Sequence, residues 1–156
     1  MEMGVFIQPS RTEWLLALRI VCAAIVGALI GWNRHRAGKP AGVGTHALVA
    51  LGAAIFVSVP VISGASHPDA LSRVIQGVAT GVGFIGAGEI FRDPGAGSRV
   101  TGLTTAAALW ATAALGVTIV CGSLLASAVL AILVLGVLEL APRVERRMKP
   151  RDAAPP

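Results

Sequence analysis

The stretch VTGLTTAAALWATAALGVTIVCGSLLASAVLAILVLGVL, residues 100–138, decides the fold of this chain. It contains no Asp, Glu, Lys, Arg or His over 39 residues. As one helix it would be about 58 Å long, nearly twice the roughly 30 Å hydrocarbon core of a bilayer. The segment therefore has to fold back, and Cys121-Gly122-Ser123 is the expected reversal. The sequence predicts two membrane spans here.

The composition of the whole chain agrees with a membrane protein. Of its 156 residues, 54% are hydrophobic and only 13% are charged, whereas globular domains are about 25% charged. Disorder is excluded because it requires low hydrophobicity, and two cysteines are too few for a disulfide scaffold. The net charge of +5 indicates loops that face anionic lipid rather than a nucleic-acid surface.

We expect an all-α integral membrane protein, a bundle of five transmembrane helices. A span needs about 20 mostly apolar residues. Residues 1–13 are expected to form a segment before the bundle, and residues 142–156 a basic tail after it. The expected spans are residues 14–32, 43–63, 72–91, 101–120 and 123–141.

Lys and Arg residues predict the orientation of the bundle. Ten of them fall in one set of connections and in the tail, against Arg11 and Arg73 on the other side. Cytoplasmic loops carry the excess of positive charge. We therefore expect a multi-pass membrane protein with the N-terminus outside and the C-terminus in the cytoplasm. A cleaved signal peptide is not expected, because the basic cluster follows the first apolar segment.

Glycines mark the expected contact surfaces between helices. In lipid a glycine allows two backbones to approach closely, where van der Waals contact is the main attraction. The third span is the richest in glycine, so we expect it at the centre of the bundle. The Leu-rich fifth span is expected to face lipid. The predicted helix-packing residues are Gly27, Gly31, Gly77, Gly81, Gly83, Gly86 and Gly88.

Polar residues gather near the predicted cytoplasmic ends of the first four spans. Ionisable residues in membrane spans are costly and are therefore candidates for function. Two interpretations stay open: interfacial salt bridges with threonines bonded back to their helices, or a proton- or cation-responsive site built on Glu89 and His46. This inner polar cluster comprises Asn33, Arg34, His46, Glu89, Arg92, Arg99, Thr101 and Thr104.

An outer polar cluster is predicted from Arg19, Asp69, Arg73 and Gln76. Asp69 can cap the third helix while accepting a bond from a guanidinium, and Arg73 and Gln76 share a helix face. The set is either a pair of snorkelling arginines with a helix cap, or a polar vestibule or partner contact. No catalytic or metal-binding motif occurs in the sequence, so neither an enzyme nor a cofactor is expected.

Several motifs, taken in order, resemble the membrane domain of the MgtC/SapB family. They are Gly27-Ala-Leu-Ile-Gly31 with Arg34, Thr45-His-Ala-Leu-Val-Ala-Leu-Gly52, Gln76 with Gly81-Val-Gly-Phe-Ile-Gly-Ala-Gly88, and Val100-Thr-Gly-Leu-Thr-Thr-Ala-Ala-Ala-Leu-Trp110. The resemblance covers about residues 14–141. It implies a bacterial inner-membrane protein linked to adaptation to low magnesium and to survival in hosts.

The chain departs from the family pattern near the inner rim. Members usually have Glu where this chain has Asn33, Arg where it has Gly44, and an apolar residue where it has Glu89. We expect Glu89 to take over the partner role of the absent glutamate, with Arg34 or Arg99.

The family resemblance also implies a mode of action. A regulatory action on membrane ATPases, including the ATP synthase, has been proposed for the family. We therefore expect a non-enzymatic regulator that works by helix–helix contact with a membrane protein partner, such as the ATP synthase or a P-type ATPase, or with itself as a homo-oligomer. The alternative is a small transporter or channel for a cation such as magnesium. No nucleic-acid partner is expected.

Overall fold

The computed structural model describes residues 11–63, 68–93 and 99–148, and the side chains at positions 92, 93 and 99 lie outside this description. Each of the five helices in this part of the chain is long and apolar enough to cross a membrane. The predicted all-α, five-span class is therefore confirmed. The helices are α1 (Arg11–Arg36), α2 (Val43–Ile62), α3 (Pro68–Gly88), α4 (Leu103–Cys121) and α5 (Leu124–Met148).

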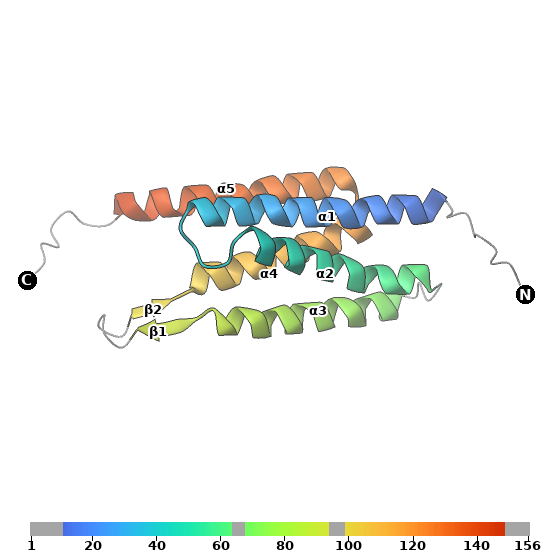
Figure 1. Cartoon of the computed structure of the whole chain (residues 1–156), viewed down its shortest axis with the longest axis horizontal. Helices are drawn as coiled ribbons and strands as arrows, with labels where there is room; N and C mark the ends of the chain where they lie inside the picture. Colours follow the sequence, from blue (N-terminus) through green and yellow to red (C-terminus); the bar gives the residue numbers. More distant parts are fainter. Residues whose placement is uncertain (1–10, 64–67, 94–98, 149–156) are drawn as a thin grey trace, which may run out of the picture.

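The helices run roughly along one long axis (Figure 1). In that view α1 and α5 lie along the top, α3 lies along the bottom, and α2 and α4 lie between them. Helix α4 contacts each of the other four helices, and α2 contacts α1, α3 and α4. Because α1 begins at one end of the bundle and α5 finishes at the other (Figure 1), the two ends of the described chain emerge on opposite sides, as an odd number of spans requires.

The centre of the bundle is α4. Its buried residues include Ala108, Leu109, Thr112 and Leu115, whereas α3 buries only Val82 and Gly86. The expectation that the glycine-rich third span lies at the centre is therefore wrong. Small residues permit close packing but do not say which face of a helix is covered, and most of the α3 glycines point away from their neighbours within the chain.

Helices α1 and α2 approach each other closely at two glycines of α1. A Cβ atom added at Gly27 would come within 2.5 Å of the carbonyl oxygen of His46, and one added at Gly31 would come within 2.6 Å of the Gly42 carbonyl oxygen. These neighbours are backbone atoms, which cannot move aside cheaply. The two glycines therefore allow α1 and α2 to touch through their backbones.

The ends of α2 and α4 lie within two residues of the expected spans, whereas both ends of α1 and α3 differ by three or four residues and α5 ends seven residues later than expected. Helix α4 ends at Cys121 and α5 begins at Leu124, which confirms the reversal at residues 121–123. Helix α5 continues through the basic residues to Met148, so part of the expected tail is helical. It buries only Ser127 and Ala131, in agreement with a lipid-facing helix.

A short antiparallel strand pair joins α3 to α4, which the sequence analysis did not predict. Strand β1 (Phe91–Asp93) pairs with β2 (Arg99–Thr101) so that Phe91 faces Thr101. Residues 94–98, between the two strands, lie outside the described part of the chain. Gly102 follows β2 with φ of +88°, and a Cβ atom there would overlap the Glu89 carbonyl oxygen. Glycine is therefore needed to close this connection.

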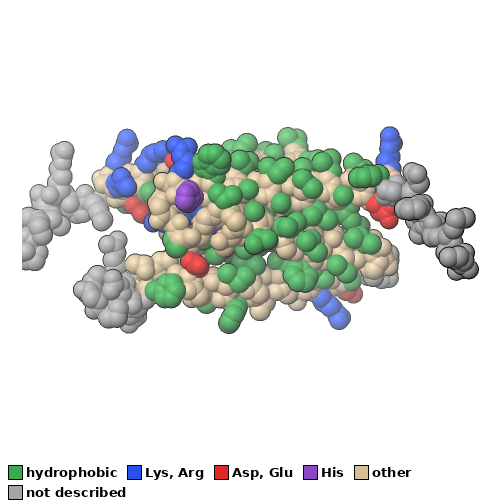
Figure 2. All heavy atoms as spheres, viewed as in Figure 1, with side chains coloured by type: hydrophobic (Ala, Val, Ile, Leu, Met, Phe, Trp, Pro, Cys, Tyr) green, Lys and Arg blue, Asp and Glu red, His purple; other side chains and the backbone are tan. Residues whose placement is uncertain are grey.

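Hydrophobic side chains cover the middle of the bundle and charged side chains lie toward its two ends (Figure 2). Basic residues gather at the end where α1 and α5 finish: Arg34, His35 and Arg36 in the last turn of α1, and Arg146 and Arg147 in that of α5. This distribution is the one expected for a chain embedded in a bilayer. The predicted direction of insertion stays a prediction.

Gly31→Ala tests the contact between α1 and α2. Its methyl group meets the backbone of Gly42 and Val43, and overpacking of this kind costs about 1–3 kcal/mol. We expect a lower temperature of thermal unfolding in detergent, measured by circular dichroism. The matched control is Gly83→Ala, whose Cβ meets nothing within 4 Å and which should leave that temperature unchanged or raise it. Equal effects of the two substitutions would contradict the contact.

Candidate functional site

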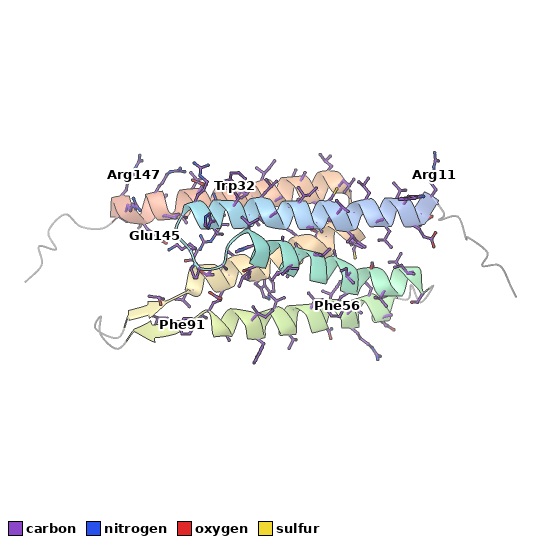
Figure 3. All side chains as sticks on the ribbon, in the orientation of Figure 1. Arg11, Trp32, Phe56, Phe91, Glu145 and Arg147 are labelled. Atoms are coloured by element: carbon purple, nitrogen blue, oxygen red, sulfur yellow. The ribbon has the colours of Figure 1, made fainter. Side chains whose placement is uncertain are left out.

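An apolar groove of about 790 Å³ lies between α2 and α3. We call it the α2–α3 groove. Phe56, labelled in Figure 3, lies on the α2 side of it. Its α2 wall includes Thr45, Leu48, Gly52 and Phe56, and its α3 wall includes Val74, Gly77, Gly81 and Ile85.

Two of the predicted helix-packing glycines face this groove. Gly77 and Gly81 stand one helical turn apart, and a Cβ atom at either would meet nothing within 4 Å. The spacing is the small-xxx-small pattern that allows close approach of membrane helices. Because no helix among the described residues fills the space above them, the wall made by Gly77 and Gly81 is open.

The other predicted packing glycines divide into two groups. Gly27, Gly31 and Gly86 contact neighbouring helices within the chain; a Cβ atom at Gly86 would lie 3.4 Å from that of Ala106. Gly83 and Gly88 also have open space around them, but they do not line the groove.

The inner end of the bundle holds two buried polar side chains, Arg34 and His46. Arg34 is 2% exposed and His46 is fully buried. His46 Nδ1 lies 3.1 Å from the Gly42 carbonyl oxygen. The atoms Nε and Nη2 of Arg34 and Nε2 of His46 are buried without a hydrogen-bond partner in the structure. An unpartnered charged group in a dry site is costly, which marks this pair as a candidate site.

The structure brings Glu89 toward this pair but leaves other members of the inner polar cluster outside it. Glu89 is half-buried in the turn after α3, rather than inside the third span as expected, and its charge acts on His46. Thr101 and Thr104 are exposed, and the Thr101 hydroxyl donates to the Phe91 carbonyl. The Arg92 and Arg99 side chains lie outside the described part.

Asn33 belongs to a separate contact between α1 and α5. Its side-chain amide donates to one carboxylate oxygen of Glu139, and Arg143 donates to the other at 2.8 Å. The last two residues are four apart on one exposed helix face. The contact holds the ends of α1 and α5 together and has no link to the buried pair.

The outer polar cluster is not assembled as expected around Arg19. The Arg19 guanidinium donates to the carbonyl oxygens of Ile119, Val120 and Gly122 at 2.8, 3.0 and 2.6 Å. The last carbonyls of a helix lack helical partners, so they are strong acceptors for a cation at that depth. The sequence analysis predicted that the fourth span ends near residue 120. The free carbonyl groups of that helix end could therefore have been recognised in the sequence as possible acceptors for Arg19.

The remaining members of the outer polar cluster are exposed on α3. Asp69, Arg73 and Gln76 lie in the first three turns of that helix. Helix α3 begins at Pro68, so Asp69 stands in its first turn, where a negative charge stabilises the helix dipole.

Comparison with known proteins agrees with the family resemblance. The model of the MgtC family matches residues 20–147. The chain is 52% identical over 120 residues to Protein SrpB of Synechococcus elongatus, covering 70% of this chain and 66% of that protein. It is 43% identical over 105 residues to Protein MgtC of Salmonella typhimurium, covering 67% of this chain and 42% of that protein.

A third relative is the putative magnesium transporter YhiD of Escherichia coli, 40% identical over 111 residues, with 65% of this chain and 49% of that protein covered. The chain thus spans 42% to 66% of the length of these relatives. No solved structure matches it. With most of its length matched by the family model and its five apolar helices in place, the chain belongs to the MgtC family.

Proposed function

We propose that this protein is a non-enzymatic regulator in the bacterial inner membrane, which acts by taking a transmembrane helix of a partner protein into the α2–α3 groove. The observation that carries the proposal is the open wall made by Gly77 and Gly81. Two helices attract each other in lipid mainly through close van der Waals contact. A wall without side chains lets the backbone of a partner helix approach closely. Mobile lipid chains make weaker van der Waals contact with such a wall than a fitted helix does.

The biological setting of the proposal comes from the family. One relative is named a putative magnesium transporter, and the family resemblance implies adaptation to low magnesium. The partner class that the resemblance implies is a membrane ATPase, such as the ATP synthase or a P-type ATPase. We infer that the helix received by the groove belongs to such an enzyme.

Gly81→Leu tests the docking role of the groove. The new side chain fills the space that a partner helix would take, so we expect at least a tenfold loss of co-purified ATPase subunits, about 1.4 kcal/mol in binding. The measurement is quantitative mass spectrometry of complexes captured from membranes through a tag on the protein. Gly83→Leu is the matched control on the same helix, with open space around it and outside the groove.

The control decides how that experiment is read. Both variants should unfold at a similar temperature in detergent, since a Cβ atom at either position meets nothing within 4 Å. Retention of the ATPase by Gly83→Leu and its loss from Gly81→Leu would support docking in the groove. Equal retention by both variants would rule the groove out as the docking site.

Cation transport is the second candidate, and it is favoured by the name of the relative YhiD. Magnesium is held by carboxylates together with several waters. The residues that the structure describes contain no group of three or more His, Cys, Asp or Glu side chains that could hold a metal ion. Buried Arg34 also places a positive charge beside His46, which opposes a cation at that end of the bundle.

Magnesium flux into liposomes separates the two candidates. Purified protein is reconstituted into vesicles that contain a magnesium-sensitive dye. We expect dye signals equal to those of protein-free vesicles, because the described spans offer too few carboxylates for a path. Flux that depends on the protein and falls in Glu89→Gln would instead establish transport.

A further inference from the structure

The first turn of α2 meets the end of α1 at two buried side chains, Arg34 and His46, each of which has nitrogen atoms without a hydrogen-bond partner in the structure. We propose that Arg34, His46 and the N-terminus of α2 together bind a phosphate group, either that of an anionic phospholipid headgroup or free phosphate. This site is separate from the α2–α3 groove and does not depend on the partner helix proposed above.

The N-terminus of α2 is one half of the site. Its N-cap is Gly42, which supplies no side-chain hydrogen bond, and its first turn contains no acidic residue. The first intrahelical bond runs from the His46 N–H to the Gly42 carbonyl, so the N–H groups before it have no helical acceptor. Such a helix end carries a partial positive charge and attracts anions.

The buried side chains of Arg34 and His46 form the second half of the proposed site. Their lack of hydrogen-bond partners is an observation independent of the helix N-terminus. Arg34 offers the donors Nε and Nη2 without an acceptor, and His46 Nε2 is also without a partner. Because His46 Nδ1 faces the Gly42 carbonyl oxygen, Nε2 donates to an anion only when the imidazole carries both protons. Both side chains are at least 98% buried. Among the described residues no carboxylate makes a hydrogen bond to either one, although the charge of Glu89 reaches His46. An ionised guanidinium in this position requires an acceptor.

The fold brings the two halves together through the glycines of α1. Gly31 touches the backbone of Gly42 and Val43, and Arg34 follows it by three residues, nearly one helical turn. His46 lies in the first turn of α2, and its carbonyl oxygen is the atom that a Cβ at Gly27 would meet. This backbone contact places Arg34, in the last turn of α1, and His46, in the first turn of α2, at the same end of the bundle as the uncapped N-terminus of α2.

The chemistry of the donors favours phosphate over a carboxylate. Nε and Nη2 of a guanidinium form a fork that matches two oxygens of an oxyanion. The first turn of α2 and the protonated imidazole add further donors. A carboxylate has two oxygens, whereas a phosphate group offers more acceptor atoms to this set.

The position of the site agrees with a phosphate near the membrane surface. It lies at the end of the bundle where basic side chains gather (Figure 2), the depth at which phospholipid headgroups are found. Gly44 and Thr45 are exposed in the first turn of α2, and a Cβ atom at Gly44 would meet nothing within 4 Å. A phosphate group can therefore approach the helix end from this side.

Thermal unfolding of the full-length protein in a neutral detergent tests the proposal. One arm adds inorganic phosphate, with potassium chloride of equal ionic strength as its reference. The other arm adds phosphatidylglycerol, with phosphatidylcholine as its reference. A ligand that binds only the folded protein raises its unfolding temperature, and we expect a rise of about 4 °C or more in at least one arm.

Substitutions decide whether the rise comes from this site. Arg34→Gln should abolish it, while Arg36→Gln, an exposed arginine two residues further on, should keep it. A rise with phosphatidylglycerol alone assigns the site to a lipid headgroup, and a rise with inorganic phosphate assigns it to the free anion as well. If Arg34→Gln does not fold, His46→Gln serves in its place. No rise in the wild type, or equal rises in Arg34→Gln and Arg36→Gln, would overturn the proposal.

Discussion

The backbone contact between α1 and α2 at Gly27 and Gly31 is the constraint on which the surrounding structure depends. It needs two positions without side chains one helical turn apart, because the neighbours are carbonyl and Cα atoms of α2. Gly116 of α4 makes a similar approach to the backbone of Ala50 on α2. Helices α1, α2 and α4 are thereby held as a tight unit, which the more exposed α3 and α5 flank.

The same constraint explains where the two candidate sites lie. With α1 and α4 packed against α2, the face of α2 that carries Leu48, Gly52 and Phe56 remains for contact with α3. Helices α2 and α3 do not pack closely along this face, and the space left between them is the α2–α3 groove. At the inner end, the tight crossing of α1 over α2 carries Arg34 into the interior beside His46, where no side chain of the described residues completes its hydrogen bonds. One feature therefore produces both an open apolar surface and a buried charge.

Much of the fold could be predicted from the sequence, because the physical signals are local. Span length and charge placement predict five helices and the reversal at residues 121–123, and the structure has both. The direction in which a glycine points is not a local property, so the third span was wrongly placed at the centre. The strand pair around Phe91 and Thr101 has three residues on each side, too few for a periodic pattern to reveal it.

The candidate sites were predicted only in part, for a related reason. The residue types of the inner polar cluster marked Arg34 and His46, but their burial depends on how closely α1 crosses α2. Arginines at the end of a span are expected to reach water. The spacing of Gly27, Gly31 and Arg34 does place Arg34 on the face of the two packing glycines, unlike exposed Arg36, but it does not give the depth of its burial. The contact of Arg19 with the end of α4 likewise depends on which helix lies beside α1.

Photo-crosslinking from the groove in living cells tests the central claim most directly. A photoreactive amino acid replaces Phe56, which lines the groove and is 62% exposed, or Leu133, which is 58% exposed on α5. The account predicts that the probe at position 56 crosslinks a transmembrane subunit of a membrane ATPase, identified by mass spectrometry, and that the probe at position 133 does not. Crosslinks to that subunit with equal yield from both positions, or from position 133 alone, would contradict it.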